Sequence, residues 1–310
     1  MKQISVIVPL YHEEAVVEKF YTALKKELVQ LQNYTHSILF VVDGDGDNTV
    51  NILRQISEHD SSVEVVVFSR NFGHQMALLA GIDHAQGDAI IMMDGDLQHP
   101  PSLIPKLLEQ FEKRNDVVHA VRESTEDIGF RRKFASQIFY RLVNIISDTP
   151  IIEGAADFRL ISRRVADIMH KNIRERNLFI RGIVNWIGFK QATVPYIAAK
   201  RAGGKSKYSL IKLVRFAFSG AISFGRRPLR IASFVGSLFA IGGFVFALWT
   251  LVQYYLGNQF PAGWATVVML LSIFGGLQLI FLGIVGEYVG AIFDEVKARP
   301  HYLVQEKINL

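Results

Sequence analysis

The chain has 310 residues, half of which are hydrophobic, and a formal net charge of +5 at pH 7. This length suits one large domain or two smaller ones. The basic balance suits a partner that carries phosphate or presents an anionic membrane surface. Cysteine is absent, which excludes a disulfide scaffold and a thiolate metal site. The first apolar run, Ile4–Leu10, is too short and too β-branched for the core of a secretory signal, so we expect no signal peptide.

Short apolar runs alternate with helical patterns in the first part of the chain. The predicted strands are Ile4–Leu10, Ile38–Val42, Val63–Phe68, Ala89–Met93 and Val117–Val121. Helical patterns run to about Leu31 and to about Glu58, and over Gln75–Ala85. This alternation predicts βαβ units, an α/β fold class and a mostly parallel sheet. Because polar turns with glycine follow the strands, ligand-type side chains are expected at the carboxyl-end edge, where open α/β sheets bind ligands.

The fourth predicted strand runs directly into Asp94 and Asp96. If the strand continues through Asp96, the two carboxylates point to the same face, because side chains two apart on a strand share a face. Adjacent carboxylates repel each other unless a cation lies between them, and Mg²⁺ or Mn²⁺ holding a diphosphate suits such oxygen ligands. The alternative is a polar strand-to-loop turn, since Asp-Gly is a common turn pair.

Basic residues are mixed with apolar ones in two helical stretches, about 128–147 and 207–230. Such helices suit a membrane interface, with their cations toward lipid phosphates. An ordinary helix with a solvated basic face is the alternative. The segment Lys200–Ser209 is rich in Gly, Lys, Arg and Ser, which is typical of a loop that closes on phosphates.

The stretches 231–256 and 264–285 contain no charged residue. They span about 26 and about 22 residues, against the roughly 20 that a bilayer requires. They predict a transmembrane hairpin, 231–286; a pair of buried helices in a soluble protein is the alternative. Arginine and lysine flank both outer ends, so the positive-inside rule places residues 1–206 and the tail 287–310 in the cytosol.

Several motifs carry a resemblance to a known family. They are Ser5–Glu14 (SVIVPLYHEE), Ser69–Gln75 (SRNFGHQ), Asp94–Pro101 (DGDLQHPP), Asp157–Leu160 (DFRL) and Gly286–Gly290 (GEYVG). With these, the chain resembles the family 2 inverting glycosyltransferases of GT-A fold. Within that family it is most similar to the polyisoprenyl-phosphate glycosyltransferases: the bactoprenol glucosyltransferases and the related dolichol-phosphate mannose synthases. The resemblance covers essentially the whole chain.

The resemblance implies a GT-A domain over 1–206 and a role for each matching position. Catalytic positions are Asp94, Asp96 and Asp157, and Asp96 with Asp94 is implied to bind the metal, Mg²⁺ or Mn²⁺. The nucleotide and donor positions are Pro9, Tyr11, Glu13, Asp43, Arg70, Gln75, Arg201, Lys205 and Lys207. The acceptor phosphate is implied to lie at Arg122, Arg132, Lys133 and Ser136.

Two features of the sequence qualify the resemblance. The family usually has two acidic residues before a glycine and then a serine, whereas here Val42 replaces the first acidic residue and Asp45 the serine. The contacts to base and ribose are therefore expected to differ from the family pattern. Processive members carry Gln-x-x-Arg-Trp, which this chain lacks, so transfer of a single sugar is expected.

The implied function is inverting, metal-dependent transfer of one hexose, glucose from UDP-glucose, to undecaprenyl phosphate at the cytosolic face of the bacterial inner membrane. The implied partners are the UDP-sugar donor, the lipid phosphate, the bilayer and further copies of the chain, up to a tetramer; nucleic acid is not expected. The same reaction with GDP-mannose or a UDP-aminoarabinose derivative stays open. A small membrane transporter subunit is the alternative of a different class, although uncharged spans offer no ion path.

Overall fold

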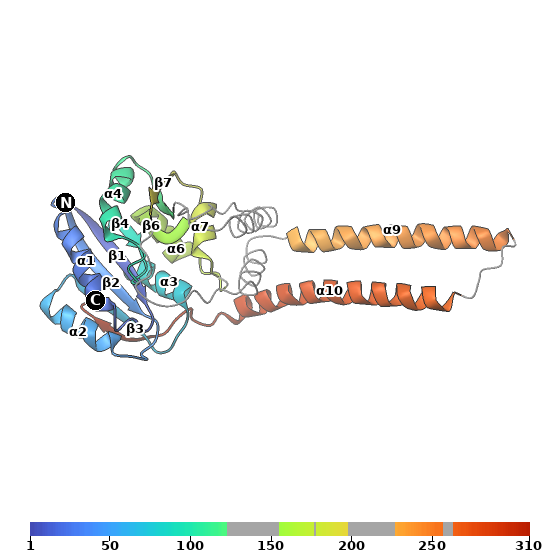
Figure 1. Ribbon diagram of the computed structural model, residues 1–310, viewed down its shortest axis with the longest axis horizontal. Coiled ribbons are helices and arrows are strands. Elements are labelled where there is room, and N and C mark those ends of the chain that lie inside the picture. Colours follow the sequence, from blue (N-terminus) through green and yellow to red (C-terminus); the bar gives the residue numbers. More distant parts are fainter. Residues whose placement is uncertain (123–154, 177, 198–226, 257–262) are drawn as a thin grey trace. The chain divides into compact units, whose positions relative to one another are not determined.

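The computed structural model describes residues 1–122, 155–176, 178–197, 227–256 and 263–310. The chain separates into two compact units. One comprises Met1–Leu142, Thr149–Ser209 and Arg299–Leu310, and the other comprises Val143–Asp148 and Leu210–Ala298. The described part of the first unit is an α/β domain, and that of the second consists of long helices (Figure 1).

The first unit contains most of the regular structure. Its strands are β1 (Lys2–Leu10), β2 (Tyr34–Val42), β3 (Val63–Phe68), β4 (Ala89–Met92), β5 (Val117–Arg122), β6 (Ala155–Ser162), β7 (Gln191–Tyr196) and β8 (Val304–Ile308). Its helices are α1 (Val17–Val29), α2 (Thr49–His59), α3 (His74–His84), the short 3₁₀ turn η1 (Pro101–Leu103), α4 (Ile104–Glu112), α6 (Arg163–Asn172) and α7 (Ile180–Trp186). The predicted α/β class and the predicted strands are confirmed, with ends that differ by a few residues.

The strands form one eight-stranded sheet in the order β7-β5-β6-β4-β1-β2-β3-β8. Neighbouring pairs are parallel except those that involve β6 and β8, which run against their neighbours. The sheet is therefore mostly parallel. The carboxyl ends of β1, β2, β4 and β5 meet the amino end of β6 at one edge, which is where open α/β sheets bind ligands.

Helices cover both faces of this sheet. Val6 and Val8 of β1 belong to a buried cluster with Phe20 and Leu24 of α1, and α2 and α4 contribute to the same cluster. On the opposite face α3 packs on β1 so closely that a Cβ on Gly81 would come within 2.1 Å of the side chain of Ile7. Burial of apolar side chains on both faces fixes the sheet, and with it the ends of the strands.

Three strands of the sheet, β6, β7 and β8, were not predicted from the sequence. The segment around Asp157 reads as polar, yet it forms β6 in the interior of the sheet, where Arg159 is only 1% exposed. The segment 287–310 was assigned to a cytosolic tail, yet β8 within it pairs antiparallel with β3.

The described part of the second unit consists of α9 (Arg227–Tyr255) and α10 (Trp264–Lys297). The rings of Phe239 on α9 and Phe274 on α10 meet edge to face at 5.9 Å. By length and composition, α10 contains one candidate membrane span, Met269–Lys297. In α9 the described apolar stretch, Ala232–Phe246, is shorter than a candidate span. Large apolar side chains on both helices, among them Phe244 and Leu279, are exposed in the isolated chain.

Candidate active site

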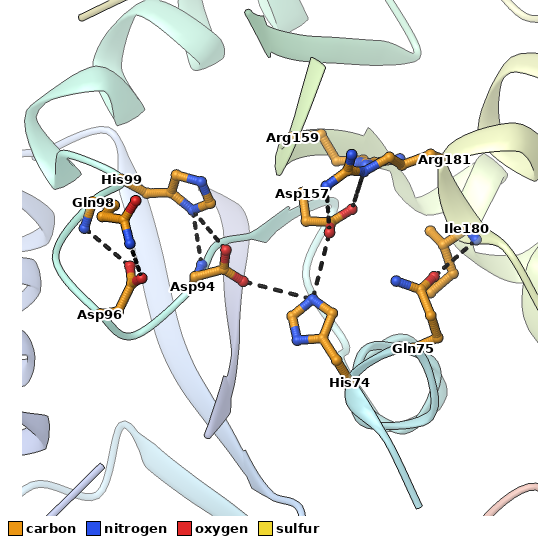
Figure 2. A network of polar contacts seen from close by, with 10 residues as sticks. All are labelled: His74, Gln75, Asp94, Asp96, Gln98, His99, Asp157, Arg159, Ile180 and Arg181. Carbon is orange, nitrogen blue, oxygen red and sulfur yellow. Dashed lines mark hydrogen bonds and ion pairs between the residues drawn. The ribbon is translucent and has the colours of Figure 1, made fainter. Parts of the chain in front are cut away.

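The end of β4 and the beginning of β6 bring two acidic residues together. Met92 on β4 pairs with Arg159 on antiparallel β6, so Asp94, two residues past Met92, and Asp157, two residues before Arg159, lie at the same level of the sheet edge. Figure 2 shows them on either side of His74. Sequence reasoning placed Asp94 at the edge of the sheet and gave Asp157 a catalytic role from the family resemblance, and it did not foresee this pairing.

The fourth strand does not continue through Asp96, so the condition for placing both carboxylates on one face of a strand is not met, and the alternative of a strand-to-loop turn holds. The strand ends at Met92, and Leu97 has a left-handed backbone with φ of 63°. The amide of Asp94 donates to Nδ1 of His99 at 3.0 Å instead of to a strand neighbour. Asp94 and Asp96 therefore lie on a loop, and the alternation of a strand does not determine their directions.

Asp157 is held by cationic side chains on both of its carboxylate oxygens. Arg159 donates from Nη2 to Oδ1 at 2.8 Å. Arg181 donates from Nε to Oδ1 and from Nη2 to Oδ2, each at 2.8 Å. Burial alone would raise the pKa of Asp157, but His74 and these arginines outweigh it and hold that pKa well below its usual range. Asp157 is therefore a fixed anion.

His74, the first residue of α3, bridges the two acids. Its Nε2 lies 3.5 Å from Oδ2 of Asp157 and 3.6 Å from Oδ1 of Asp94. Burial would lower the pKa of His74, but the hydrogen bond to Asp157 and the charges of both acids raise it above its usual value. The imidazole thereby offsets part of the repulsion between the two carboxylates.

Asp94 is the least satisfied acid of the site. Burial raises the pKa of its carboxyl above the usual value. His99 and His74 lower that pKa in part, and the charges of Asp157 and Asp96 raise it further. Within the described part of the chain, Oδ1 of Asp94 is buried and has no hydrogen-bond partner. Because a buried carboxylate oxygen without a partner is costly, this oxygen is suited to a ligand.

Asp96 lies on the same loop and is held by Gln98. The backbone amide of Gln98 donates to Oδ1 of Asp96 at 3.0 Å, and its side-chain Nε2 donates to Oδ2. In Figure 2 this pair lies beside His99, on the far side of Asp94 from His74. His99 is itself buried and stacks on Phe158 at 5.2 Å, so the loop is anchored to β6.

Asp43, predicted to read the base, is buried after β2. Its Oδ1 accepts from the amide of Phe72 at 2.6 Å and its Oδ2 from that of Gly73 at 2.9 Å. These bonds fix the loop that leads into α3 and therefore the position of His74. Gly44 permits the close approach: its φ is +96°, and a Cβ there would lie 2.9 Å from the amide nitrogen of Asn71.

The other predicted donor residues lie around this loop and the end of β1. The guanidinium of Arg70 lies over the ring of Phe72 at 4.1 Å. Oε1 of Gln75 accepts from the amide of Ile180 at 3.0 Å, so it connects α3 to the start of α7. Pro9 is buried in β1, whereas Tyr11, just beyond the strand, is 51% exposed.

Glu13 and Arg122 lie at two further points of the sheet edge. The amide of Glu13 donates to Oγ1 of Thr49 at 3.2 Å, which joins the loop after β1 to α2. Arg122 is exposed at the end of β5, level with Tyr196 of β7. The remaining predicted site residues lie outside the described residues; they are Arg132, Lys133, Ser136, Arg201, Lys205 and Lys207. The predicted interfacial helix 128–147 and most of the predicted helix 207–230 also lie outside them.

Sequence reasoning missed side chains that organise the site. Four of them lie inside the family motifs: His74, Gln98, His99 and Arg159. Their place in those motifs, as polar or charged residues, could have marked them as site residues. Arg181 lies in none of them. Its role depends on the return of the chain from α6 to the sheet edge, which no local pattern of the sequence encodes.

The donor set of the Asp94–Asp96 loop suits a hard divalent cation. No group of three or more His, Asp or Glu residues that could hold a metal ion occurs among the described residues. Mg²⁺ and Mn²⁺ bound with a diphosphate characteristically use one or two carboxylates and take their other ligands from phosphate and water. The carboxylates of Asp94 and Asp96 supply that number of ligands, and within the described part of the chain Oδ1 of Asp94 has no hydrogen bond, although it forms an ion pair with His74.

The comparisons with known proteins agree with this geometry. Residues 5–169 match the model of the family "Glycosyl transferase family 2", and this chain belongs to that family and is a glycosyltransferase. It is 40% identical over 308 residues to "Uncharacterized glycosyltransferase YkcC" of Bacillus subtilis (strain 168), covering 99% of this chain and 95% of that protein. It is 37% identical over 304 residues to "Bactoprenol glucosyl transferase" of Shigella phage SfII, covering 98% of both chains.

A solved structure shares the fold. Mannosyltransferase PcManGT from Pyrobaculum calidifontis, in complex with GDP-Man and Mn²⁺, superposes with a TM-score of 0.52 at 18% identity, covering 96% of this chain and 86% of that one. The likeness supports the GT-A class that the sequence predicted.

Proposed function

We propose that this glycosyltransferase moves one hexose, glucose from UDP-glucose, to the phosphate of a membrane polyisoprenyl lipid, undecaprenyl phosphate, with inversion at the anomeric carbon. The observation that carries the proposal is the sheet edge where His74 lies between Asp94 and Asp157. In the described part of the chain the buried Oδ1 of Asp94 has no hydrogen bond beside its ion pair with His74, whereas Asp157 is held by two arginines. The similarity to bactoprenol glucosyl transferase over nearly the full length supports the choice of acceptor and sugar.

The donor lies at this edge in the proposal. Asp94 and Asp96 hold Mg²⁺ or Mn²⁺, which when bound neutralises charge that develops on the leaving diphosphate. The loop after β3, fixed by Asp43, and the exposed Tyr11 border the nucleotide. Arg201, Lys205 and Lys207 are assigned to the diphosphate from the family resemblance.

The acceptor needs no strong base. A phosphate monoester carries about −1.5 to −2 charge at neutral pH, so it attacks without first losing a proton. Arg122 lies exposed at the end of β5, where it binds the acceptor phosphate with Arg132, Lys133 and Ser136. Asp157, held as an anion, stabilises positive charge at the anomeric carbon and orients the sugar.

We also infer that α9 and α10 form a transmembrane hairpin in a bacterial inner membrane, with the α/β domain on the cytosolic side. The uncharged stretches 231–256 and 264–285, the exposed apolar side chains of both helices and the contact between Phe239 and Phe274 support it. The hairpin tethers the enzyme to the membrane that contains the lipid acceptor, which supplies proximity. Association into homo-oligomers, up to a tetramer, belongs to the same proposal.

The test is transfer by the purified protein in detergent, with radiolabelled UDP-glucose, GDP-mannose and a UDP-aminoarabinose derivative offered in turn against undecaprenyl phosphate. We expect glucose to enter the lipid fraction, transfer to stop in EDTA and transfer to return with Mg²⁺ or Mn²⁺. Labelled lipid from a different donor would correct the sugar. No labelled lipid from any donor would refute the reaction.

The metal assignment has a separate test. Asp96→Ala is expected to abolish transfer while the protein stays folded and membrane-bound, because the cation loses a ligand. Glu109→Ala on the exposed face of α4 is the matched control for removing a carboxylate, and it should transfer normally. Turnover of Asp96→Ala near that of the control would refute the assignment.

A further inference from the structure

Arg181 makes a bidentate contact that the charge balance of Asp157 does not require. The buried Arg159 beneath it already pairs with Asp157 at 2.8 Å. Arg181 adds two hydrogen bonds at 2.8 Å each, and it reaches Asp157 from α7, an element separate from β6. Its side chain is 31% exposed, against 1% for Arg159.

The geometry of these contacts fixes the direction of the carboxylate as well as its charge. Oδ1 accepts from Arg159 and from Nε of Arg181, and Oδ2 accepts from Nη2 of Arg181 and faces Nε2 of His74. A planar guanidinium that binds both oxygens prevents rotation of the carboxylate plane. Without Arg181, one hydrogen bond from Arg159 and the longer 3.5 Å contact with His74 would remain, and neither is bidentate.

We propose that Arg181 is a positioning residue for sugar transfer, which holds the Asp157 carboxylate in one orientation toward the reacting sugar without itself binding donor or acceptor. This inference rests on the proposed function. The amide of Ile180, at the start of α7, donates to the side chain of Gln75 on α3. This bond couples the position of α7, which carries Arg181, to that of α3, which carries His74.

The reaction is balanced without a proton on Asp157. An oxygen of the acceptor phosphate forms the bond to the anomeric carbon, the bond from that carbon to the donor diphosphate breaks, and its electron pair leaves with the nucleoside diphosphate. Asp157 keeps its charge and its partners throughout. An orientation error of this group therefore raises the barrier of the chemical step much more than it weakens ground-state binding.

The test compares Arg181→Ala and Arg181→Lys with Arg174→Ala. Arg174 is a matched control, because it grips Asp83 through two bonds at 2.9 and 2.7 Å with a side chain 35% exposed, and Asp83 lies outside the site. We expect Arg181→Ala to lower kcat by about 100-fold with KM for UDP-glucose and for undecaprenyl phosphate within about twofold of wild type. Arg181→Lys should recover only part of the turnover, since lysine cannot bind bidentately.

Thermal unfolding in detergent separates a structural effect from positioning. Both alanine variants should lose a similar amount of Tm, while only Arg181→Ala loses turnover. A raised KM for the lipid phosphate with kcat retained would show that Arg181 binds the acceptor, and equal turnover of the two variants would show a structural role alone; either result overturns the inference. If the wild-type protein itself transfers no sugar, the proposed function fails first.

Discussion

At the scale of single residues, two aspartates of the sheet edge are used in different ways. Asp157 is held by side-chain cations, whereas Asp43 accepts hydrogen bonds from two backbone amides, those of Phe72 and Gly73. The first arrangement sets a charge and its direction. The second sets the path of a loop, and through that loop the place of His74 in the site.

The loop role of Asp43 predicts a cost in stability. Asp43→Ala leaves two amides without their charged acceptor in a buried place, and we expect the free energy of unfolding to fall by about 2–3 kcal/mol. Asp43→Asn, which keeps one acceptor oxygen, should lose less. Denaturant unfolding in detergent measures both values. Unchanged stability in the alanine variant would contradict the loop role.

Asp83 predicts a dependence of stability on pH. Burial would raise the pKa of its carboxyl, but hydrogen bonds from Arg174, His170 and Tyr302 lower it below the usual value of about 3.9. The unfolded chain therefore takes up this proton at a higher pH than the folded one, and the contribution to stability is lost as pH falls below about 4. The difference in stability between wild type and Asp83→Asn should shrink from about pH 5 to about pH 2; a constant difference would contradict this.

The sequence indicated which residues belong to the site better than it indicated their partners. A strand end located Asp94 and Asp96 at the sheet edge, and a family motif singled out Asp157, because strand ends and motifs are local features. The clamp on Asp157 depends on Arg181 reaching β6 from α7. That contact joins distant parts of the chain, and only the fold determines it.

At the scale of elements, β8 fastens the segment after α10 to the edge of the sheet. It pairs with β3, and Tyr302 just before it stacks on buried Phe68 at 5.0 Å and donates to Asp83 at 2.7 Å. The amide of Ser69 donates to the carbonyl of Leu303 at 3.0 Å. The C-terminal segment thereby supports the start of the loop that leads into α3.

This arrangement predicts unequal effects of two substitutions in one segment. Tyr302→Ala removes a stacked ring and a hydrogen bond to a buried carboxylate, and we expect a loss of about 2–4 kcal/mol in the free energy of unfolding. Glu306→Ala removes an exposed pair with Arg54 and should cost under about 1 kcal/mol. Equal losses would show that Tyr302 does not anchor the segment.

Two of the three unpredicted strands, β6 and β8, show where a sequence pattern fails to indicate a strand. β6 carries Asp157 and Arg159 in the interior of the sheet, so its polarity masks a strand whose charges compensate each other. β8 is a five-residue edge strand whose side chains alternate between half-buried and exposed, a signal too short to separate from a loop. The long apolar runs of β1 to β4 were predictable because burial on both faces demands them.

At the scale of the whole molecule, the proposed hairpin places the amino end of α9 and the carboxyl end of α10 on the same side of a membrane. The chain has no cysteine, so single cysteines report topology without background. Asn258→Cys, between the two uncharged stretches, should react with a membrane-impermeant maleimide in intact bacteria. Glu306→Cys should react only after the cells are opened. Labelling of both or neither before opening would contradict the hairpin.

The most direct measurement of the central claim is the anomalous scattering of manganese in crystals grown with Mn²⁺ and UDP. The account predicts a manganese peak within coordination distance of carboxylate oxygens of Asp94 and Asp96, with the UDP diphosphate bound to the same ion. Manganese or nucleotide bound elsewhere, with those carboxylates in contact with neither, would contradict it.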